Sequence, residues 1–110
     1  MDDDYVEAVL DLVAAIPAGR AMTYGTVAEV VSDDFVARGE AARGGPRQVG
    51  QVMARAGSGV PWWRVVNAAG APPARHLARA LEQLVAERTP MTADGRRVRL
   101  RAAIWFPDDE

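Results

Sequence analysis

Apolar side chains recur at the spacing of an α-helix in three stretches of this 110-residue chain. The start of a further short helix is marked by Thr23 and Thr26, which are both candidate N-caps, and Thr26 opens a capping box that closes at Glu29. Pro46 suits the first position of a helix, and Pro90 prevents helix from continuing. We therefore expect helices over residues 4–15, 24–32, 46–56 and 76–88.

Between the helices, the sequence predicts loops and short strands. Residues 33–45 are rich in glycine and lack a sustained period, so we expect a loop there. Residues 63–66 form a β-prone run, and Asp94-Gly95 lies between short apolar segments, which indicates a small hairpin. A mainly α fold with small β elements follows, and the order of its elements is typical of a winged helix-turn-helix variant. In such a fold, the helix over 46–56 approaches a DNA groove.

Length and composition indicate a single domain over residues 1–110. No apolar run approaches the roughly 20 residues that a membrane span needs, and the acidic N-terminus is unlike a secretion signal. We therefore expect a cytoplasmic protein. The chain has no cysteine and a single histidine, His76, so it lacks disulfides, a cysteine nucleophile and the usual ligands of a metal site. We expect no metal and no cofactor.

The formal net charge of −2 conceals a basic middle segment, because acidic residues gather at both ends of the chain. Residues 12–107 hold all 13 arginines and only seven acidic residues, so this segment carries a formal charge of +6. Arginine favours planar, bidentate contact with phosphate, which fits a nucleic-acid partner. A solvated basic surface explains the charge equally well, and the acidic residues at 2–4 and 108–110 fit a role in solubility.

Three segments carry a family resemblance: residues 16–28 (IPAGRAMTYGTVA), 47–53 (RQVGQVM) and 61–67 (PWWRVVN). Together they resemble the DNA-binding domain of O6-alkylguanine-DNA alkyltransferases. That family shows Ile-Pro-x-Gly, Thr-Tyr-Gly-x-x-Ala, Arg-x-Val-Gly-x-x-Met and Pro-Cys-His-Arg-Val-Val, in this order. Trp62 stands where the alkyl-accepting cysteine would be, which is the mark of the alkyltransferase-like subgroup. The final IWFP at residues 104–107 also resembles that subgroup.

The chain departs from the family pattern in three places. Trp63 replaces the histidine that relatives usually keep, the loop over 33–45 is longer than expected, and the connection from Gly70 to Leu77 is short. The first departure concerns the floor of the site, and the other two concern its loops. The fold that the resemblance implies is unaffected.

The resemblance implies that the protein turns a nucleotide out of the duplex, because O6 of guanine is buried in the base stack. Tyr24 would press on the phosphate beside the target, and Arg47 would enter the stack to fill the gap. Without the motifs, Tyr24 is typical of an aromatic packed at a helix start and Arg47 of a solvated arginine. Thr23, Gln48 and Gly50 are implied DNA contacts. A helical glycine costs about 1 kcal/mol relative to alanine, so DNA or a neighbouring helix is expected to approach Gly50 closely.

The resemblance also implies a pocket for the alkylated base. Trp62 would offer an apolar face to the alkyl group and no nucleophile to accept it. Trp63 would pack beneath the loop, while Arg64, Val65 and Asn67 would shape the loop and offer backbone contacts. The implied pocket residues are Tyr24, Pro61, Trp62, Trp63, Arg64, Val65, Asn67 and Arg75.

Two charged residues match functional positions of the active enzymes. Glu87 matches the carboxylate that polarises the histidine and cysteine in active enzymes, but both partners are missing here, so a structural role is expected. Arg75 matches a basic loop residue that senses the flipped base, and His76 beside it is expected at the surface.

The implied function is non-enzymatic binding of O6-alkylguanine in duplex DNA by a monomer, which flags the lesion for nucleotide excision repair proteins. One alternative is a winged-helix DNA binder that reads base edges, although the helix over 46–56 offers few side chains for this. A second is a protein-interaction module that uses Trp62 and Trp63, without lesion specificity. A third is an enzyme that acts without cysteine, but the sequence offers no Ser-His pair, carboxylate pair or metal set.

Overall fold

Contacts between residues divide the chain into two units that alternate along the sequence. The computed structural model describes residues 2–107, so the acidic residues at 108–110 lie outside the described part. The first unit takes in the chain up to residue 15 and residues 24–62, and the second takes in residues 16–23 and the chain from residue 63 onward. The single domain expected over 1–110 remains a prediction. None of the helices within the described residues has the length and apolar character that a membrane crossing requires.

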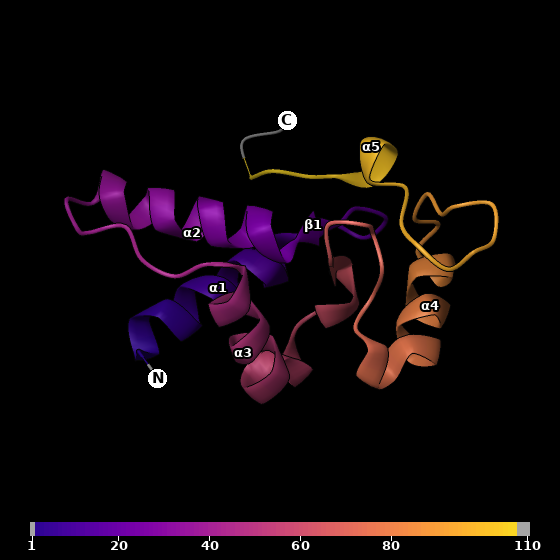
Figure 1. Ribbon diagram of the computed structural model, residues 1–110, viewed down its shortest axis with the longest axis horizontal. Coiled ribbons are helices and arrows are strands. Elements are labelled where there is room, and N and C mark those ends of the chain that lie inside the picture. The colour runs from indigo at the N-terminus through magenta and orange to yellow at the C-terminus, as the bar shows by residue number, and fades with distance from the viewer. Residues whose placement is uncertain (1, 108–110) are drawn as a thin grey trace. The chain divides into compact units, whose positions relative to one another are not determined.

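Three helices form the first unit, namely α1 (Asp3–Ala15), α2 (Tyr24–Ala37) and α3 (Pro46–Ala56) (Figure 1). The predictions for α1 and α3 are confirmed within one residue at each end. Each helix packs against the other two, because its apolar residues recur every three or four positions and form one face. The buried residues on these faces are Tyr5, Val9, Val13, Val27, Ala28, Val31, Phe35, Val49 and Val52.

Helix α2 is longer than the sequence predicted, and the prediction of a loop from residue 33 was wrong. Val31 and Phe35 are both 1% exposed and lie one helical turn apart, so the apolar face continues past the expected end. The helix ends because Gly39 adopts a φ of +85°. Its N–H donates to the carbonyl oxygen of Val36 at 2.9 Å, and the Glu40 N–H donates to that of Phe35 at 2.9 Å. This pair of bonds is a Schellman cap.

A parallel two-stranded sheet lies in the second unit, where β1 (Met22–Thr23) pairs with β2 (Val65–Val66). The strand predicted over 63–66 is confirmed only in its second half, because residues Trp62–Arg64 form a 3₁₀ turn instead. The sequence did not predict β1. Pairing with β1 therefore holds Val65 and Val66, which follow Trp62 in the chain, in place.

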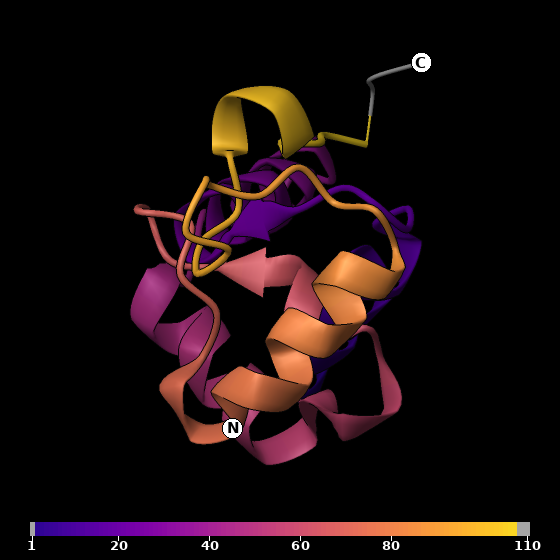
Figure 2. The same ribbon diagram turned by 90° about the vertical axis from the view of Figure 1, so that its right-hand side faces the viewer.

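The rest of the second unit contains α4 (Leu77–Ala86) and the short α5 (Leu100–Ala103). The predicted helix over 76–88 is confirmed with slightly shorter bounds, and a 3₁₀ turn (Ala74–His76) precedes it. The predicted hairpin is reduced to one antiparallel bridge between Met91 and Val98, and α5 was not predicted. Leu84 of α4 and Val66 of β2 join Ala21, Val98 and Ala103 in one buried cluster. Figure 2 shows α4 in orange and the short α5 in yellow. The expected mainly helical fold with small β elements is confirmed.

Candidate nucleic-acid interface

Helix α3 presents an apolar and a polar face in the first unit. Val49 and Val52 are fully buried, whereas Arg47, Gln48 and Gln51 are exposed. Gly45 is extended at the N-cap, and Pro46 begins the helix. The first turn therefore directs Arg47 and Gln48 toward solvent, as a residue that enters a DNA duplex requires.

Gly50 lies on α3 with open space around it. A Cβ atom added there would meet nothing within 4 Å among the described residues, apart from its own helix backbone. Packing within the protein therefore gives no reason for glycine, although glycine costs about 1 kcal/mol relative to alanine inside a helix. Of the two explanations that the sequence left open, a neighbouring helix has no support, and approach of an external partner remains.

Tyr24 is the first residue of α2 and is half-buried. Burial raises the pKa of its hydroxyl above the ordinary value of 10.0. The hydroxyl therefore stays protonated at neutral pH and can donate a hydrogen bond to an acceptor such as a phosphate oxygen. Thr23, the preceding residue, belongs to β1 of the second unit and is also half-buried.

Pro61 and Trp62 end the first unit and are both half-buried. The Trp62 N–H donates to the carbonyl oxygen of Val60 at 2.7 Å, so the backbone turns tightly at this point. Trp63 begins the second unit, where its side chain packs against the buried cluster around Val66 and Leu84. Because of this packing, we assign Trp63 to the core that supports the loop.

Arg64 and Glu87 form a bidentate ion pair in the second unit. Arg64 Nε donates to Glu87 Oε1 at 3.0 Å, and Nη2 donates to Oε2 at 2.5 Å. Arg64 Nη1 also donates to the carbonyl oxygen of Ile16 at 2.7 Å. Burial pushes the pKa of Glu87 upward, but hydrogen bonds from Arg64 and Trp63, the Arg64 charge and the Gly19 backbone more than offset it, so the pKa is lowered. Glu87 therefore holds the loop that contains Arg64, and this is the kind of structural role that the sequence led us to expect.

The remaining predicted pocket residues of the second unit have different exposures. Val65 is fully buried in β2, so its side chain shapes the loop. Asn67 is exposed, and its Oδ1 accepts from the N–H groups of Ala69 and Ala71 at 3.0 and 2.9 Å, which closes a turn. Arg75 lies exposed in the 3₁₀ turn before α4. Asn67 is thus a turn-forming residue, and Arg75 has a side chain available to a ligand.

The chain has no cysteine, and no group of three or more histidine and carboxylate side chains within residues 2–107 is placed to hold a metal ion. Sequence reasoning singled out no residue between 33 and 45, yet Arg43 there contacts Asp2 at the start of α1 and Phe35 of α2. Phe35, which continues the apolar stripe of Val31, was the available signal that this segment is ordered.

The chain matches the sequence pattern of a known family along most of its length. Residues 4–89 match the family described as 6-O-methylguanine DNA methyltransferase, DNA binding domain. The chain is 41% identical over 71 residues to the DNA base-flipping protein of Escherichia coli (strain K12) and equally to that of Shigella flexneri. This match covers 63% of the chain and 48% of each relative, so it spans about half the length of these proteins.

Two solved structures share the fold over almost the whole chain. One is S. pombe Atl1 in complex with damaged DNA that contains O6-carboxymethylguanine, with a TM-score of 0.72 and 30% identity. The other is S. pombe ATL in complex with DNA, with a TM-score of 0.71 and 29% identity. Each match covers 97% of this chain and 99% of the other. The predicted alkyltransferase-like fold is thereby confirmed.

Proposed function

The chain belongs to the family of 6-O-methylguanine DNA methyltransferase DNA-binding domains, and we propose that it binds O6-alkylguanine in duplex DNA by base flipping without accepting the alkyl group. One observation carries this proposal: 97% of the chain matches a protein solved on DNA that contains O6-carboxymethylguanine. The chain itself has no cysteine to which an alkyl group could be transferred. The proposed function of the site is therefore to recognise the lesion.

Arg47 and Tyr24 carry out the flipping step in this proposal. Turning a nucleotide out of the stack costs a few kcal/mol, which favourable interactions with the flipped nucleotide and its vacated place must offset. The exposed guanidinium of Arg47 is planar, so it stacks in the vacated place while its donors pair with the orphaned base. The protonated hydroxyl of Tyr24 donates to the phosphate beside the target. Gln48 and Gly50 lie along the same helix as Arg47 and contact the duplex beside it.

Trp62 recognises the alkyl group in this proposal. Its indole offers a flat apolar face, and apolar contact with the alkyl carbon favours the lesion over guanine. Arg75, which is exposed before α4, senses the flipped base. The backbone of the loop over Arg64, Val65 and Asn67 contributes hydrogen bonds to the base, and Thr23 contacts the DNA backbone.

Because the lesion persists after recognition, another activity must remove it. We infer that nucleotide excision repair proteins act next and that one copy of this chain marks each lesion. This handover is supported by chemistry alone: without a cysteine to accept the alkyl group, the chain leaves the O6-alkylguanine unchanged, so the lesion persists until another protein acts on it.

The proposal is tested by measuring binding of the purified protein to a duplex with one O6-methylguanine and to the same duplex with guanine. Both measurements use one salt concentration, because phosphate contacts respond steeply to salt. Mass spectrometry of the protein then tests for transfer. We expect tighter binding to the lesion and an unchanged protein mass. Equal affinities would contradict lesion recognition, and an increased mass would contradict binding without alkyl transfer.

A further inference from the structure

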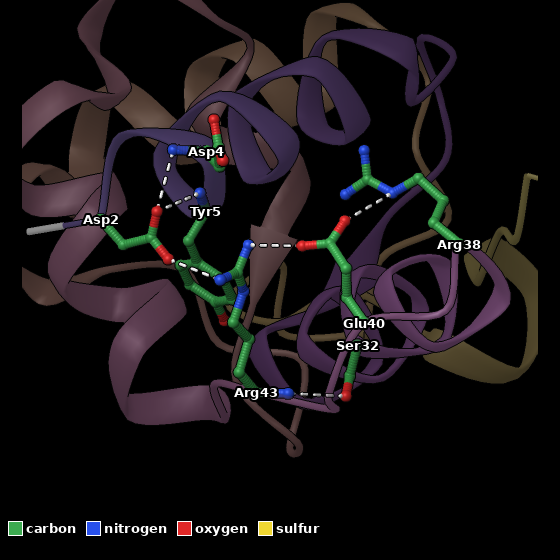
Figure 3. Close-up of polar contacts among 7 residues, drawn as sticks. All are labelled: Asp2, Asp4, Tyr5, Ser32, Arg38, Glu40 and Arg43. Carbon is green, nitrogen blue, oxygen red and sulfur yellow. Dashed lines mark hydrogen bonds and ion pairs between the residues drawn. The ribbon is translucent and has the colours of Figure 1, made fainter.

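The side chain of Arg43 connects the loop that precedes the Arg47 helix to the rest of the first unit (Figure 3). This loop, residues 38–45, joins α2 to α3 and contains Gly39, Gly44 and Gly45. Glycine gives the unfolded chain many conformations, so such a segment is costly to order. The Arg43 backbone N–H donates to Ser32 Oγ of α2 at 3.2 Å. The loop is therefore ordered against α2 at the position of Arg43.

The Arg43 guanidinium makes three different contacts. Nη1 pairs with Asp2 Oδ2 at 3.0 Å, and Nη2 pairs with Glu40 Oε1 at 3.7 Å (Figure 3). The guanidinium carbon lies 3.8 Å from the centroid of the Phe35 ring, which is the distance of a cation–π contact. Phe35 is buried in α2, so Arg43 joins the start of α1, the body of α2 and the loop.

The Asp2 carboxylate is itself held in place. Its Oδ1 accepts from the N–H groups of Asp4 and Tyr5 at 3.0 and 3.4 Å, which is the arrangement of a helix N-cap (Figure 3). One carboxylate thus caps α1 with one oxygen and binds Arg43 with the other. The anchor for Arg43 is a structured helix end.

The end of the loop is held close to both α1 and α3. Gly44 adopts a φ of +81°, and a Cβ atom there would collide with the Tyr5 hydroxyl, so the backbone lies directly against α1. A hollow of about 210 Å³ is bounded by Asp2, Tyr5, Arg43 and Gly44 and also by Gln48 and Gln51 of α3. Arg43 therefore lies beside the exposed edge of α3, four residues before Arg47.

We propose that Arg43 is a positioning residue that holds the 38–45 loop and thereby presets the first turn of α3, which carries Arg47. This inference rests on the proposed function, in which Arg47 enters the duplex. With Arg43 in place, the loop is ordered before DNA arrives, and base flipping does not have to supply the ordering free energy. Without Arg43, that cost falls on the flipped complex, so lesion preference falls more than affinity for intact DNA.

The first measurement is amide hydrogen exchange of the free protein, comparing Arg43→Ala with Arg38→Ala. Arg38 is the matched control, because it also lies over Phe35, at 4.5 Å, and pairs with Glu40, but its side chain is 58% exposed. We expect Arg43→Ala to raise exchange at least tenfold over residues 40–48 and to leave α4 unchanged. Unchanged exchange over 40–48, or an equal rise in both variants, would overturn the proposal.

Two more variants separate positioning from a loss of folding. Asp2→Asn keeps an N-cap side chain but removes the charge that binds Arg43. It should therefore raise hydrogen exchange over residues 40–48, but less than Arg43→Ala does. Arg43→Lys keeps the charge but lacks the planar group over Phe35, so it should restore part of the protection that alanine removes. If Asp2→Asn leaves the loop fully protected while Arg43→Ala unfolds the unit, Arg43 has only a folding role and the proposal fails.

The second measurement is the ratio of affinities for O6-methylguanine and guanine duplexes at fixed salt. We expect Arg43→Ala to lower this ratio about tenfold and to change affinity for the intact duplex less than threefold. An unchanged ratio with a loosened loop would overturn positioning while leaving lesion recognition intact. If the wild-type protein shows no lesion preference, the proposed function fails, and hydrogen exchange still decides whether Arg43 presets the first turn of α3.

Discussion

Arg64 and Glu87, which lie 23 residues apart, meet through two parallel hydrogen bonds with side chains only 15% and 13% exposed. By its resemblance to the family pattern, Glu87 matches a carboxylate that would serve a histidine and a cysteine, and this chain has tryptophan in both of those places. The carboxylate is instead occupied by the arginine of the same motif. The pair therefore fastens the loop and engages both oxygens of the Glu87 carboxylate.

The first prediction concerns acid stability. The pKa of Glu87 is lowered from its ordinary 4.5, so the stability that it contributes is present above about pH 4.5 and is lost as the pH falls through the lowered value. Glu87→Gln should cost about 2 kcal/mol of unfolding free energy at pH 7, because the largely buried Arg64 charge loses its anionic partner. That difference should shrink toward pH 3 in urea titrations. Glu82→Gln, on the exposed side of α4, is the control, and a pH-independent loss at Glu87 would contradict the assignment.

The second prediction is that Trp62→Cys does not restore alkyl transfer. A cysteine thiol has an ordinary pKa of about 8.5 and needs a base or a nearby positive charge to react quickly at neutral pH. Residue 63 is tryptophan packed on the core, and Glu87 is bound to Arg64. Mass spectrometry after incubation with O6-methylguanine duplex should show no alkylated Trp62→Cys protein. Rapid alkylation would mean that the cysteine alone is enough.

The third prediction concerns two glycines with the same backbone conformation and different surroundings. Gly70 has a φ of +88° and a Cβ atom there would collide with the carbonyl group of Val98, whereas Gly95 has a φ of +71° and open space. Gly95→Ala should cost about 1 kcal/mol, for the backbone conformation alone. Gly70→Ala should cost about 3 kcal/mol, because the added atom also disrupts the Val98 N–H bond to the Gly70 oxygen. Equal losses in thermal unfolding would show that the close approach is unimportant.

The sequence predicted those helices that are formed by contacts between residues close together in the chain. Periodicity placed α1 and α3 within one residue, because a helix repeats its contacts every three or four positions. It failed for α2, where a run of polar residues masked the buried Phe35. It also failed for β1, whose two residues are a strand only because Met22 and Thr23 pair with Val65 and Val66 more than 40 residues away. Such pairing leaves no local pattern.

In the candidate site, too, the sequence predicted local features and missed long-range contacts. The motifs placed Arg47 on the first turn of α3, and the structure has it exposed there. No pattern in the sequence connects Arg64 with Glu87 or Arg43 with Asp2, since each pair is long-range along the chain and arises from packing. The role of Arg43 in ordering its loop could therefore be argued only from the structure.

The fourth prediction is that Arg47→Ala weakens lesion preference and Arg55→Ala does not. Both arginines are exposed on α3, but Arg47 lies in the first turn and Arg55 in the last. Each substitution removes one positive charge, so both should reduce affinity for intact duplex to a similar, salt-dependent extent. Only Arg47→Ala should lower the ratio of lesion to intact affinity, by about tenfold or about 1.4 kcal/mol. Equal ratios in the two variants would contradict insertion of Arg47 into the stack.

The fifth prediction sets stability against binding at Gly50. An added Cβ atom meets nothing in the free protein, so Gly50→Ala should stabilise it by up to about 1 kcal/mol through helix propensity. If DNA approaches the α3 backbone at this point, the same methyl group collides with the duplex, and affinity should fall at least tenfold. Thermal unfolding and duplex binding of one variant measure both effects. Gly59→Ala, in the 3₁₀ turn after α3 with equally open surroundings, is the control and should bind normally. A more stable Gly50→Ala protein with unchanged DNA affinity would show that the duplex does not approach this face of α3.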